Sequence, residues 1–384
     1  MNKKITIVGC GISAATLANI LANKGWTVTI YEKQKFIGGN CRDSLNGDGI
    51  LIHNYGPHIF HTSYEDVYQF ISQFTQLNGY VNKVYVNVDN KLFPLPINFK
   101  SIEIIMPDKA KEVIATLQSR FPNQKTITLF DLKQVEDPNV KEFLDYISKN
   151  VYFNYSAKMW GKKFEEIDPN TINRVKIILG YDHNYFPEDK YQGLPTEGYT
   201  AMIKKMVDHK NIAIQTDIDV LNFMKFEEDG VTINGKPFNE PLVYCGPIDE
   251  ALNYKYGTLP YRSLEIKFET LKQTKFQESA VVNYPADPTM TRIAEYKSMT
   301  LQQVDGKTTI SREYPGEFAP NSSRFGVRYY PVINELSKAL YEKYAADFKK
   351  YPNVYPLGRL SQYKYFDMDD AIKQALDLAK QLDK

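Results

Sequence analysis

The sequence predicts an α/β protein with a parallel sheet, an inserted helical unit and a separate antiparallel sheet. Two β-branched runs, residues 3–8 and 28–32, flank an amphipathic stretch, which is the β-α-β order of a parallel sheet. From about residue 107 to 152, apolar residues recur every three or four positions, which is typical of helices. Residues 262–268 and 280–292 instead alternate apolar and polar side chains, which indicates antiparallel strands.

The first β-α-β unit carries the residues of a dinucleotide site. Gly9 permits the tight turn out of the strand, and Gly11 lets the backbone approach a pyrophosphate with no Cβ in the way. Ala14 keeps the helix close to the sheet, and the first helical turn around Ser13 offers N–H groups and a partial positive charge. Glu32, about twenty residues on, can accept hydrogen bonds from a ribose.

The residues after Glu32 favour FAD over NAD, which the first motif alone does not separate. Gly38, Gly39 and Asn40 place a second glycine pair just past the acid, an extension that many FAD proteins carry. A glycine-rich turn in some other α/β protein is the alternative, but the strands, helix and acid all stand at the required spacing. The predicted first unit is therefore a Rossmann-like FAD-binding domain.

Composition excludes several classes of partner. With 47 basic and 46 acidic residues the net charge is +1, so no field exists to recruit nucleic acid or an anionic membrane. Three cysteines without CxxC spacing argue against a disulfide framework and against a metal site, and they fit the cytoplasm. The first strand begins too soon for a signal peptide, and no apolar run approaches the roughly 18 residues of a membrane span.

The remaining elements follow in order along the chain. Residues 48–55 form a strand that leads into a histidine-rich stretch, and a capping box at residues 62–65 opens a helix that runs to about Phe74. Residues 168–191 mix proline, glycine and aromatic residues, as functional loops do. Further elements are a helix at 192–208, strands at 81–92, 212–220, 242–245 and 354–357, and a helix opened by residues 366–370.

These elements divide the chain into three predicted domains. The FAD-binding domain combines residues 1–80, 193–250 and 345–384. A helical domain with a mobile lid spans residues 97–192. An antiparallel-sheet substrate domain combines residues 81–96 and 251–344.

The motifs together resemble the bacterial UDP-galactopyranose mutase family nearly end to end. They are, in order, VGCGISAA, EKQKFIGGN, YGPHIFHT, MWG, NYF, YQGLPTEGYT, YCGPID, YRSL, TRIAEYK, YYPV and GRLSQYKYFDMDDAI. The resemblance implies an isomerase that interconverts UDP-galactopyranose and UDP-galactofuranose for galactofuranose-containing cell-surface glycans. It also implies that FAD acts in its reduced form, that flavin N5 makes the bond to the sugar, and that the protein is a homodimer.

The resemblance also assigns substrate contacts. Arg174, on the predicted lid, and Arg292 are similar to the pair that clamps the diphosphate, while Tyr155 and Trp160 match the uridine end. Arg262 looks like a nucleotide-side contact, with a structural salt bridge as the alternative. The other expected substrate residues are His61, which lies toward the sugar, and Asn82, Ser156, Tyr185, Asn283, Tyr329 and Tyr365.

The resemblance also assigns residues near the flavin ring, and these come from both ends of the chain. His58 matches a residue that lies against the N5 side of the ring, and Arg359 matches an arginine near the ring. The helix N-terminus after Asp367 would stabilise negative charge on the reduced ring. The remaining expected cofactor residues are Ile59, Phe366, Met368 and Ala371.

Other hypotheses stay open beside the mutase. A flavin oxidoreductase of the amine-oxidase type would share the first motif, the glycine pair and the terminal helix, but it needs neither two diphosphate arginines nor a uridine site. A non-catalytic escort protein on the same scaffold would not need to keep FAD. A 2-acetamido sugar in place of galactose is the nearest competing substrate.

Overall fold

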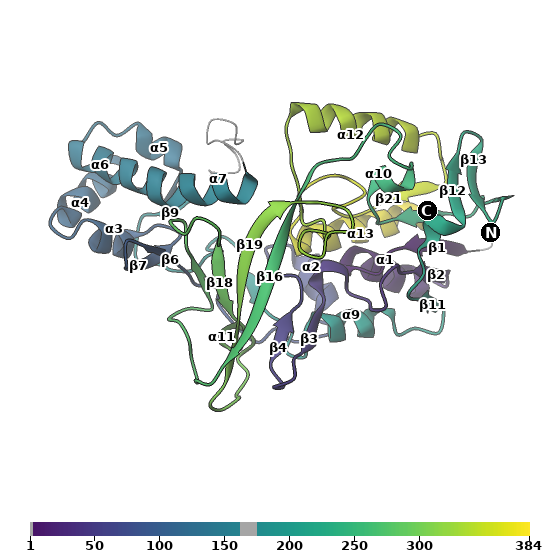
Figure 1. The fold of residues 1–384 in the computed structure, drawn as a ribbon, viewed down its shortest axis with the longest axis horizontal. Coiled ribbons are helices and arrows are strands. Elements are labelled where there is room, and N and C mark those ends of the chain that lie inside the picture. Colours follow the sequence, from purple (N-terminus) through teal and green to yellow (C-terminus); the bar gives the residue numbers. More distant parts are fainter. Residues whose placement is uncertain (1–2, 162–174) are drawn as a thin grey trace.

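The computed structural model describes residues 3–161 and 175–384, and their elements lie in three parts along one axis (Figure 1). A parallel sheet and both chain termini lie at one end, a group of helices lies at the other, and a long twisted sheet runs between them. Within these two ranges, no helix is long and apolar enough to cross a membrane.

Five parallel strands form the sheet that the first motif predicts. Their order is β11-β2-β1-β15-β21, so strands far apart in the sequence become neighbours. The central strand β1 (Lys4–Val8) pairs with β2 (Thr27–Tyr31) and with β15 (Leu242–Tyr244). The outer strands are β11 (Ile212–Gln215) and β21 (Val354–Pro356). The predicted return of the 212–220 and 242–245 segments to the first sheet is confirmed.

The two faces of this sheet are covered differently. Successive strand residues point to opposite faces, so Ile7 and Val243 pack under one layer and Val8 and Tyr244 under the other. The first layer consists of the helices α1 (Ile12–Asn23), α2 (Glu65–Ile71), α9 (Tyr199–Val207) and α13 (Met368–Leu382). The second consists of α10 (Ile248–Ala251), α12 (Glu335–Phe348), β12 (Met224–Glu227), β13 (Gly230–Ile233) and β14 (Lys236–Pro237).

An aspartate from another segment caps α9. The Asp43 carboxylate accepts the N–H groups of Tyr199 at 2.6 Å and Thr200 at 2.9 Å, which are among those left without a partner at a helix start. Gly198 makes this approach feasible, because a Cβ there would lie 2.6 Å from an Asp43 oxygen. Asp43 belongs to the hairpin of β3 (Asp43–Leu45) and β4 (Leu51–His53), so the cap ties this hairpin to the helical layer.

The second large sheet is mixed, whereas the sequence predicted an antiparallel one. Its order is β20-β16-β19-β18-β17-β6-β7, and all neighbours are antiparallel except β6 and β17. A parallel pair requires a long crossover connection, and the chain between these two strands, which includes the whole helical unit, is long enough to provide it. The strands are β6 (Val84–Val88), β7 (Lys91–Leu95), β16 (Tyr261–Leu271), β17 (Val281–Asn283), β18 (Arg292–Glu295), β19 (Thr308–Glu317) and β20 (Tyr330–Pro331).

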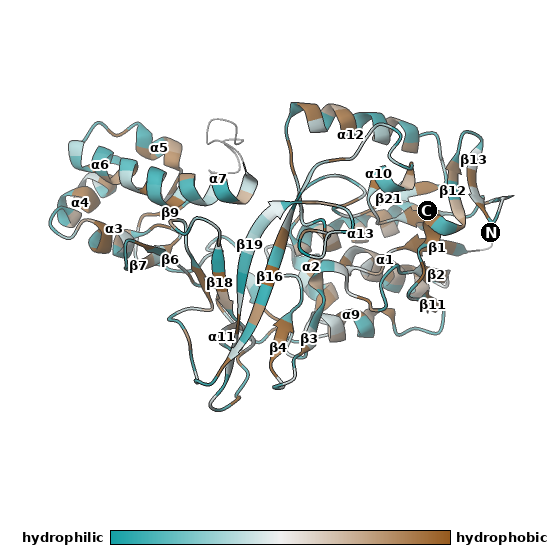
Figure 2. Ribbon diagram, viewed as in Figure 1, coloured by the Kyte–Doolittle hydropathy of each residue, from teal (hydrophilic) through white to brown (hydrophobic). Residues whose placement is uncertain are grey.

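The helical unit packs on the β6–β7 end of this sheet. Its apolar stripes share one core with Val84, Val86 and Phe93, and Figure 2 shows both hydrophilic and hydrophobic bands along α6, as expected for a half-buried helix. The helices are α3 (Phe99–Ile105), α4 (Ala110–Arg120), α5 (Leu129–Lys133), α6 (Pro138–Ile147), a π-helical turn (Ser148–Phe153) and α7 (Asn154–Trp160). The division of the chain into three domains stays a prediction.

The capping box predicted at residues 62–65 is wrong. The helix begins at Glu65 with Tyr64 as its N-cap, and Thr62 is the last residue of β5 (Phe60–Thr62). Thr62 is held in the strand because β5 pairs with β10 (Tyr191–Gly193). Its Oγ1 accepts the Tyr64 N–H at 3.0 Å, which is a turn contact before the helix.

The remaining short elements connect these parts. They are η1 (Gly39–Cys41), η4 (Val220–Asn222), β8 (Thr126–Ile127), β9 (Ile177–Ile178) and α11 (Tyr296–Thr300).

Candidate functional site

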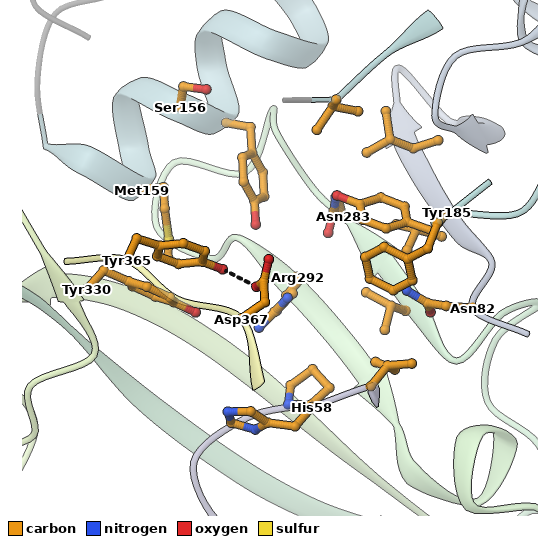
Figure 3. Close-up of a pocket in the computed structure, with 18 of the residues that line it drawn as sticks. His58, Asn82, Ser156, Met159, Tyr185, Asn283, Arg292, Tyr330, Tyr365 and Asp367 are labelled. Atoms are coloured by element: carbon orange, nitrogen blue, oxygen red, sulfur yellow. Dashed lines mark hydrogen bonds between the residues drawn. The ribbon is translucent and has the colours of Figure 1, made fainter. Parts of the chain in front are cut away.

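A cavity of about 520 Å³ lies where the parts of the fold meet. Figure 3 shows its wall: α7 contributes Ser156 and Met159, the mixed sheet contributes Asn283 and Arg292, and the chain before α13 contributes Tyr365 and Asp367. His58 lies on the opposite side of the cavity from α7 (Figure 3). Since no single element could assemble this set, the cavity exists only in the complete fold.

Arg292 is fixed in the cavity wall by a buried carboxylate. Its Nε donates to Oε2 of Glu313 at 2.7 Å, and Glu313 is 1% exposed on the neighbouring strand β19. Burial alone would lower the pKa of Arg292, but the Glu313 charge and hydrogen bond, together with the phenols of Tyr155 and Tyr330, outweigh burial and the net pKa is raised. The guanidinium therefore stays charged, and its bond through Nε leaves the two terminal NH₂ groups as further donors.

Two cations hold α7 against the mixed sheet. The Lys158 ammonium donates to three main-chain oxygens of one turn, Tyr284 O at 2.8 Å, Met290 O at 2.5 Å and Asp287 O. Burial lowers the pKa of Lys158 to about 8. Arg262 Nε donates to Met159 O at 2.7 Å, so it caps the carboxyl end of the helix. These contacts set the position of the α7 residues that line the cavity, Tyr155, Ser156, Met159 and Trp160.

The histidines of the YGPHIFHT stretch have different surroundings. His53 is 1% exposed, and its Nδ1 accepts the main-chain N–H of His58 at 2.9 Å. His58 lines the cavity, and its Nδ1 lies 2.8 Å from Gly56 O. Because the imidazolium form would be desolvated, burial lowers the pKa of both rings to about 3. Both rings are therefore neutral at physiological pH.

His61 has an acidic partner. Its Nδ1 lies 2.7 Å from Oδ2 of Asp189, and its ring stacks on Phe186 with centroids 3.6 Å apart and planes 13° apart. His61 and Phe186 both line the cavity.

The far wall brings together residues from three segments. Asn283 on β17 stands directly opposite Arg292 on β18 in the register of the sheet, so both side chains lie on the cavity face. The main-chain oxygen of Asn82 accepts the Tyr185 N–H at 2.9 Å, which fixes the start of the segment that carries Phe186 and Asp189.

The edge of the cavity near α13 combines a helix N-terminus with a cation. Tyr365 Oη donates to Oδ1 of Asp367, the N-cap of α13, at 3.1 Å (Figure 3). Arg359 donates to Tyr329 O at 3.0 Å and to Phe366 O at 2.6 Å, and its guanidinium carbon lies 5.0 Å from the Tyr365 ring centre. The first N–H groups of α13 and the Arg359 charge suit an anionic or electron-rich ring.

The turn after β1 has the space and the acceptors that a dinucleotide needs. A Cβ on Gly39 would lie 3.1 Å from the Gly11 Cα, so the close approach of these two backbone segments favours glycine at position 39. Gly9 has φ +97°, which favours glycine. The buried Glu32 carboxylate accepts Cys10 N–H at 2.7 Å and Gln34 N–H at 2.8 Å, and burial raises its pKa. These residues fit the ribose and pyrophosphate of FAD.

Several expected cofactor residues support this turn rather than line the cavity. Ser13 and Ala14 are buried in the first turn of α1, and Asn40 donates to Arg328 O at 3.1 Å. Ala371 is buried on α13. Ile59, Arg359, Asp367 and Met368 line the cavity itself.

The structure places most of the expected substrate residues, together with the flavin-side residue His58, around this cavity. Arg174 lies outside the described residues. Arg262 contacts the carboxyl end of α7 instead of the cavity, and Tyr329 is buried beside the cavity without lining it. Those that line the cavity are His58, His61, Asn82, Tyr155, Ser156, Trp160, Tyr185, Asn283, Arg292 and Tyr365.

Among the lining residues that sequence reasoning missed are Tyr55, Met159, Phe186 and Tyr330, and it also missed the partner acids Asp189 and Glu313. For Tyr330 the sequence did hold a signal. Adjacent residues of an extended chain point to opposite sides, so only one of Tyr329 and Tyr330 can face the cavity. The partner acids had no such signal, because their contacts depend on strand register and loop path.

The comparisons with known proteins agree along the chain. A UDP-galactopyranose mutase family model matches residues 150–365, and a model of NAD(P)-binding Rossmann-like domains matches residues 7–74. The UDP-galactopyranose mutase of Mycoplasma genitalium is 39% identical over 381 residues, which cover 98% of this chain and 94% of that protein. The dTDP-fucopyranose mutase of Escherichia coli is 30% identical, covering 98% of this chain and 97% of that protein.

A solved structure supports the fold. The crystal structure of reduced UDP-galactopyranose mutase matches all of this chain and 94% of its own, with a TM-score of 0.68 at 16% identity. The family model spans more than half of the present sequence, and the relatives align along almost all of it. The chain therefore belongs to the UDP-galactopyranose mutase family, whose members are flavin-dependent isomerases.

Proposed function

We propose that the protein interconverts UDP-galactopyranose and UDP-galactofuranose with bound, reduced FAD, and so supplies galactofuranose for cell-surface glycans. This proposal rests on the Arg292–Glu313 pair, which fixes a cation in the cavity wall. The aromatic residues Tyr155 and Trp160 of α7 and the histidines His58 and His61 line the same cavity. Because the reaction involves no net oxidation, the role of the protein is to bind the substrate and the cofactor and to orient them toward each other.

Arg292 binds the diphosphate in this proposal. Breaking the bond between the sugar and UDP leaves extra negative charge on the diphosphate, and a guanidinium binds phosphate oxygens bidentately while it stays protonated. Arg174 is proposed as the second cation. Tyr155 and Trp160 on α7 take the uridine end, where an aromatic ring stacks on uracil. The phenol of Tyr185 is a proposed donor to the diphosphate, and the phenol of Tyr365 would turn from Asp367 to donate to it.

The opposite wall holds the flavin ring in this proposal. When bound and reduced, FAD supplies an electron-rich nitrogen that can bond to the anomeric carbon. His58, as a neutral ring, and the Arg359 charge position the flavin ring, and the α13 N-terminus stabilises negative charge on it. The Gly9–Gly11 turn and Glu32 hold the adenosine half.

The test is a conversion assay on purified protein. We expect a yellow protein that converts UDP-galactofuranose to UDP-galactopyranose only after reduction with dithionite. Arg292→Ala should abolish most turnover while FAD stays bound. The matched control is Arg312→Ala, because Arg312 lies on β19 and pairs with Glu269 outside the cavity. Near-normal activity of Arg292→Ala would refute the diphosphate assignment.

The same assay separates competing functions. Substrate specificity is tested by offering UDP-galactopyranose, a 2-acetamido analogue and dTDP-fucopyranose side by side, and we expect the first to be used best. Oxygen consumption with an amine substrate would support a flavin oxidase instead. Colourless protein would favour a non-catalytic role.

We also propose that the protein acts in the cytoplasm as a homodimer, without nucleic acid or membrane as partner. All three cysteines are free thiols, and Cys10 and Cys41 are buried, which suits a reducing compartment. Light scattering on the eluted FAD-loaded protein tests the assembly, since it gives the mass of the particle. A monomer at micromolar concentration would contradict the dimer.

A further inference from the structure

The cavity contains two histidines that differ in their hydrogen-bond partners. Nδ1 of His58 lies 2.8 Å from a main-chain carbonyl oxygen, which is a neutral acceptor. Nδ1 of His61 lies 2.7 Å from a carboxylate oxygen of Asp189. A carboxylate stabilises the protonated imidazole and a neutral carbonyl does so much less. Of the two rings, His61 is therefore the one whose Nδ1 is oriented by an acidic side chain.

The His61–Asp189 pair is held rigidly. His61 lies on β5, where it pairs with Gln192 of β10, and its ring is stacked on Phe186. The second carboxylate oxygen of Asp189 accepts Ser63 Oγ–H at 3.2 Å. Both partners are thus fixed by strand pairing, stacking and a further hydrogen bond, so the Nδ1 contact has one geometry. Nε2, at the other edge of the ring, is left for a substrate in the cavity that His61 lines.

The proposed reaction requires one proton to change position on the sugar. Conversion of the six-membered to the five-membered ring breaks the bond from C1 to O5 and forms a bond from C1 to O4. O5 becomes a hydroxyl and gains a proton, while the O4 hydroxyl becomes the ring oxygen and loses one. No electrons are gained or lost overall, so a group that gives a proton and then takes one back completes the balance.

We propose that His61 carries this proton, with Asp189 as the residue that positions it. The protonated imidazole gives the Nε2 proton to O5 as the pyranose opens, and Nε2 then takes the proton from O4 as the furanose closes. The ring ends each turnover as it began, and the reverse reaction uses the two steps in the opposite order. This inference rests on the proposed function and adds an acid–base residue to it.

The charges around His61 favour this assignment. Asp189 faces it from the segment after Phe186, and Asp369 interacts with it electrostatically from α13. Asp370 follows on the same helix, whereas the nearby Lys190 is paired with Glu65. Tyr64 precedes α2. The elements that pack against His61 therefore carry more acidic groups than cations, and the α13 cation Lys373 is itself paired with Asp66.

The first experiment compares three variants with the wild type. All four proteins are loaded with FAD and reduced with dithionite. His61→Gln should lower kcat by about 10²- to 10⁴-fold, the usual contribution of a general acid–base group, with flavin content and UDP binding unchanged. Asp189→Asn should lower kcat by less and move the alkaline limb of the pH–rate profile to lower pH, because the imidazolium loses its partner. The matched control, Glu188→Gln, removes an exposed charge one residue away and should change neither.

A loss of UDP binding in His61→Gln that parallels the loss of kcat would overturn the acid–base role. An unchanged profile in Asp189→Asn would overturn the positioning role.

The second experiment determines which ring nitrogen of His61 carries the proton, and it does not depend on turnover. In ¹⁵N-histidine-labelled, FAD-loaded protein there are five histidine signals to assign, and His61→Gln identifies one of them. We expect the neutral His61 ring to carry its proton on Nδ1, facing Asp189. A proton on Nε2 would overturn the proposal. Failure of the wild-type protein to act on UDP-galactofuranose would instead refute the proposed function, and the NMR result would still report on the pair.

Discussion

Arg292 depends on one buried carboxylate for its position and its charge. Glu313 reaches it because the two residues are direct partners in the register of β18 and β19. Its other oxygen, Oε1, is buried and close to Gly56, where an added Cβ would lie 3.1 Å away. A negative charge therefore stands directly behind the cation that we assign to the diphosphate. The pair is close to neutral, which limits how tightly it can hold UDP.

The first prediction concerns this compensation. Glu313→Gln keeps the shape and an acceptor for Arg292 Nε but removes the charge. We expect the protein to be less stable by up to about 3–5 kcal/mol, because removing one charge of a buried pair leaves the other charge uncompensated. We also expect UDP to bind more tightly, since Arg292 is no longer neutralised. Thermal unfolding and calorimetric titration with UDP measure the two effects.

Glu269→Gln is the control, because Glu269 pairs with Arg312 at the surface of the same sheet. Weaker UDP binding by Glu313→Gln with FAD retained would show that the carboxylate mainly orients the guanidinium.

A second prediction at this scale is a pH dependence of stability. Burial lowers the pKa of His53 to about 3, whereas an unfolded histidine titrates near 6.5. The unfolded chain therefore binds an extra proton between these values. The stability from the neutral ring is fully present above about pH 6.5 and falls by about 1.4 kcal/mol per pH unit below it. Unfolding midpoints of the wild type and His53→Gln, measured from pH 8 to pH 4, should converge toward acid. Parallel curves would contradict this.

At the scale of elements, α7 is positioned by its neighbours more than by its own sequence. It follows a π-helical turn, and within the part of the chain that the structure describes it is held by Lys158 and Arg262. Gly161 ends it with φ +63°, and a Cβ there would lie 2.8 Å from an Arg262 nitrogen. Tyr155 and Trp160 thus reach the cavity because two cations dock their helix. Arg262, expected at the nucleotide, contributes through α7 instead.

The third prediction tests this docking. Lys158→Met removes a charged donor with three carbonyl partners, so α7 should be less well fixed and UDP affinity should fall, while FAD content stays normal. Since burial lowers the pKa of Lys158 to about 8, the wild-type affinity should begin to fall above about pH 8. The variant should show no such step.

Titration calorimetry at pH 7 and pH 9 measures both effects. Lys149→Met, at an exposed site one π-helical turn before α7, is the control and should behave as wild type. Equal UDP affinity of Lys158→Met and wild type at pH 7 would show that packing alone holds the helix.

At the scale of the whole molecule, the cavity lies between two sheets whose main cores differ, while Tyr261 of β16 packs with Val8 and Tyr244 of the parallel sheet in a third core. One core is shared by the parallel sheet and its helices, and another joins the mixed sheet to the helical unit. A cofactor bound at the Gly9–Gly11 turn and extending to His58 would contact both. Binding to the folded state alone stabilises a protein by about 2.7 kcal/mol at a concentration 100 times the dissociation constant.

The fourth prediction follows from that linkage. Gly11→Val fills the space in front of Gly39, where a Cβ at Gly11 would already lie 3.9 Å from the Gly39 Cα. We expect colourless protein with a lower unfolding midpoint that added FAD does not restore. Absorbance at flavin wavelengths and thermal scans with and without FAD measure this. Gly47→Val, at an open turn with no neighbour within 4 Å, is the control and should stay yellow. A yellow, active Gly11→Val would refute the placement of the cofactor.

Much of the fold was predictable because its signals are local. The first β-α-β unit, α9, β21 and α13 form close to where their patterns place them. The two errors are both tertiary in origin. Thr62 has the side chain of an N-cap, but strand pairing with β10 holds it before the helix. The parallel pairing of β6 and β17 requires a long crossover, and no local pattern reports that the chain between them makes one.

The sequence by itself determined the dinucleotide turn, the order of the elements and the set of residues from which a nucleotide-sugar site could be built. Each was read from short motifs whose residues are neighbours in the chain, and contacts within such motifs cost little conformational entropy to form. The tertiary structure alone decided that Glu313 stands behind Arg292, that Tyr330 rather than Tyr329 lines the cavity, and that His61 but not His58 has an acidic partner. These contacts depend on strand register and loop path, which only packing of the complete chain fixes.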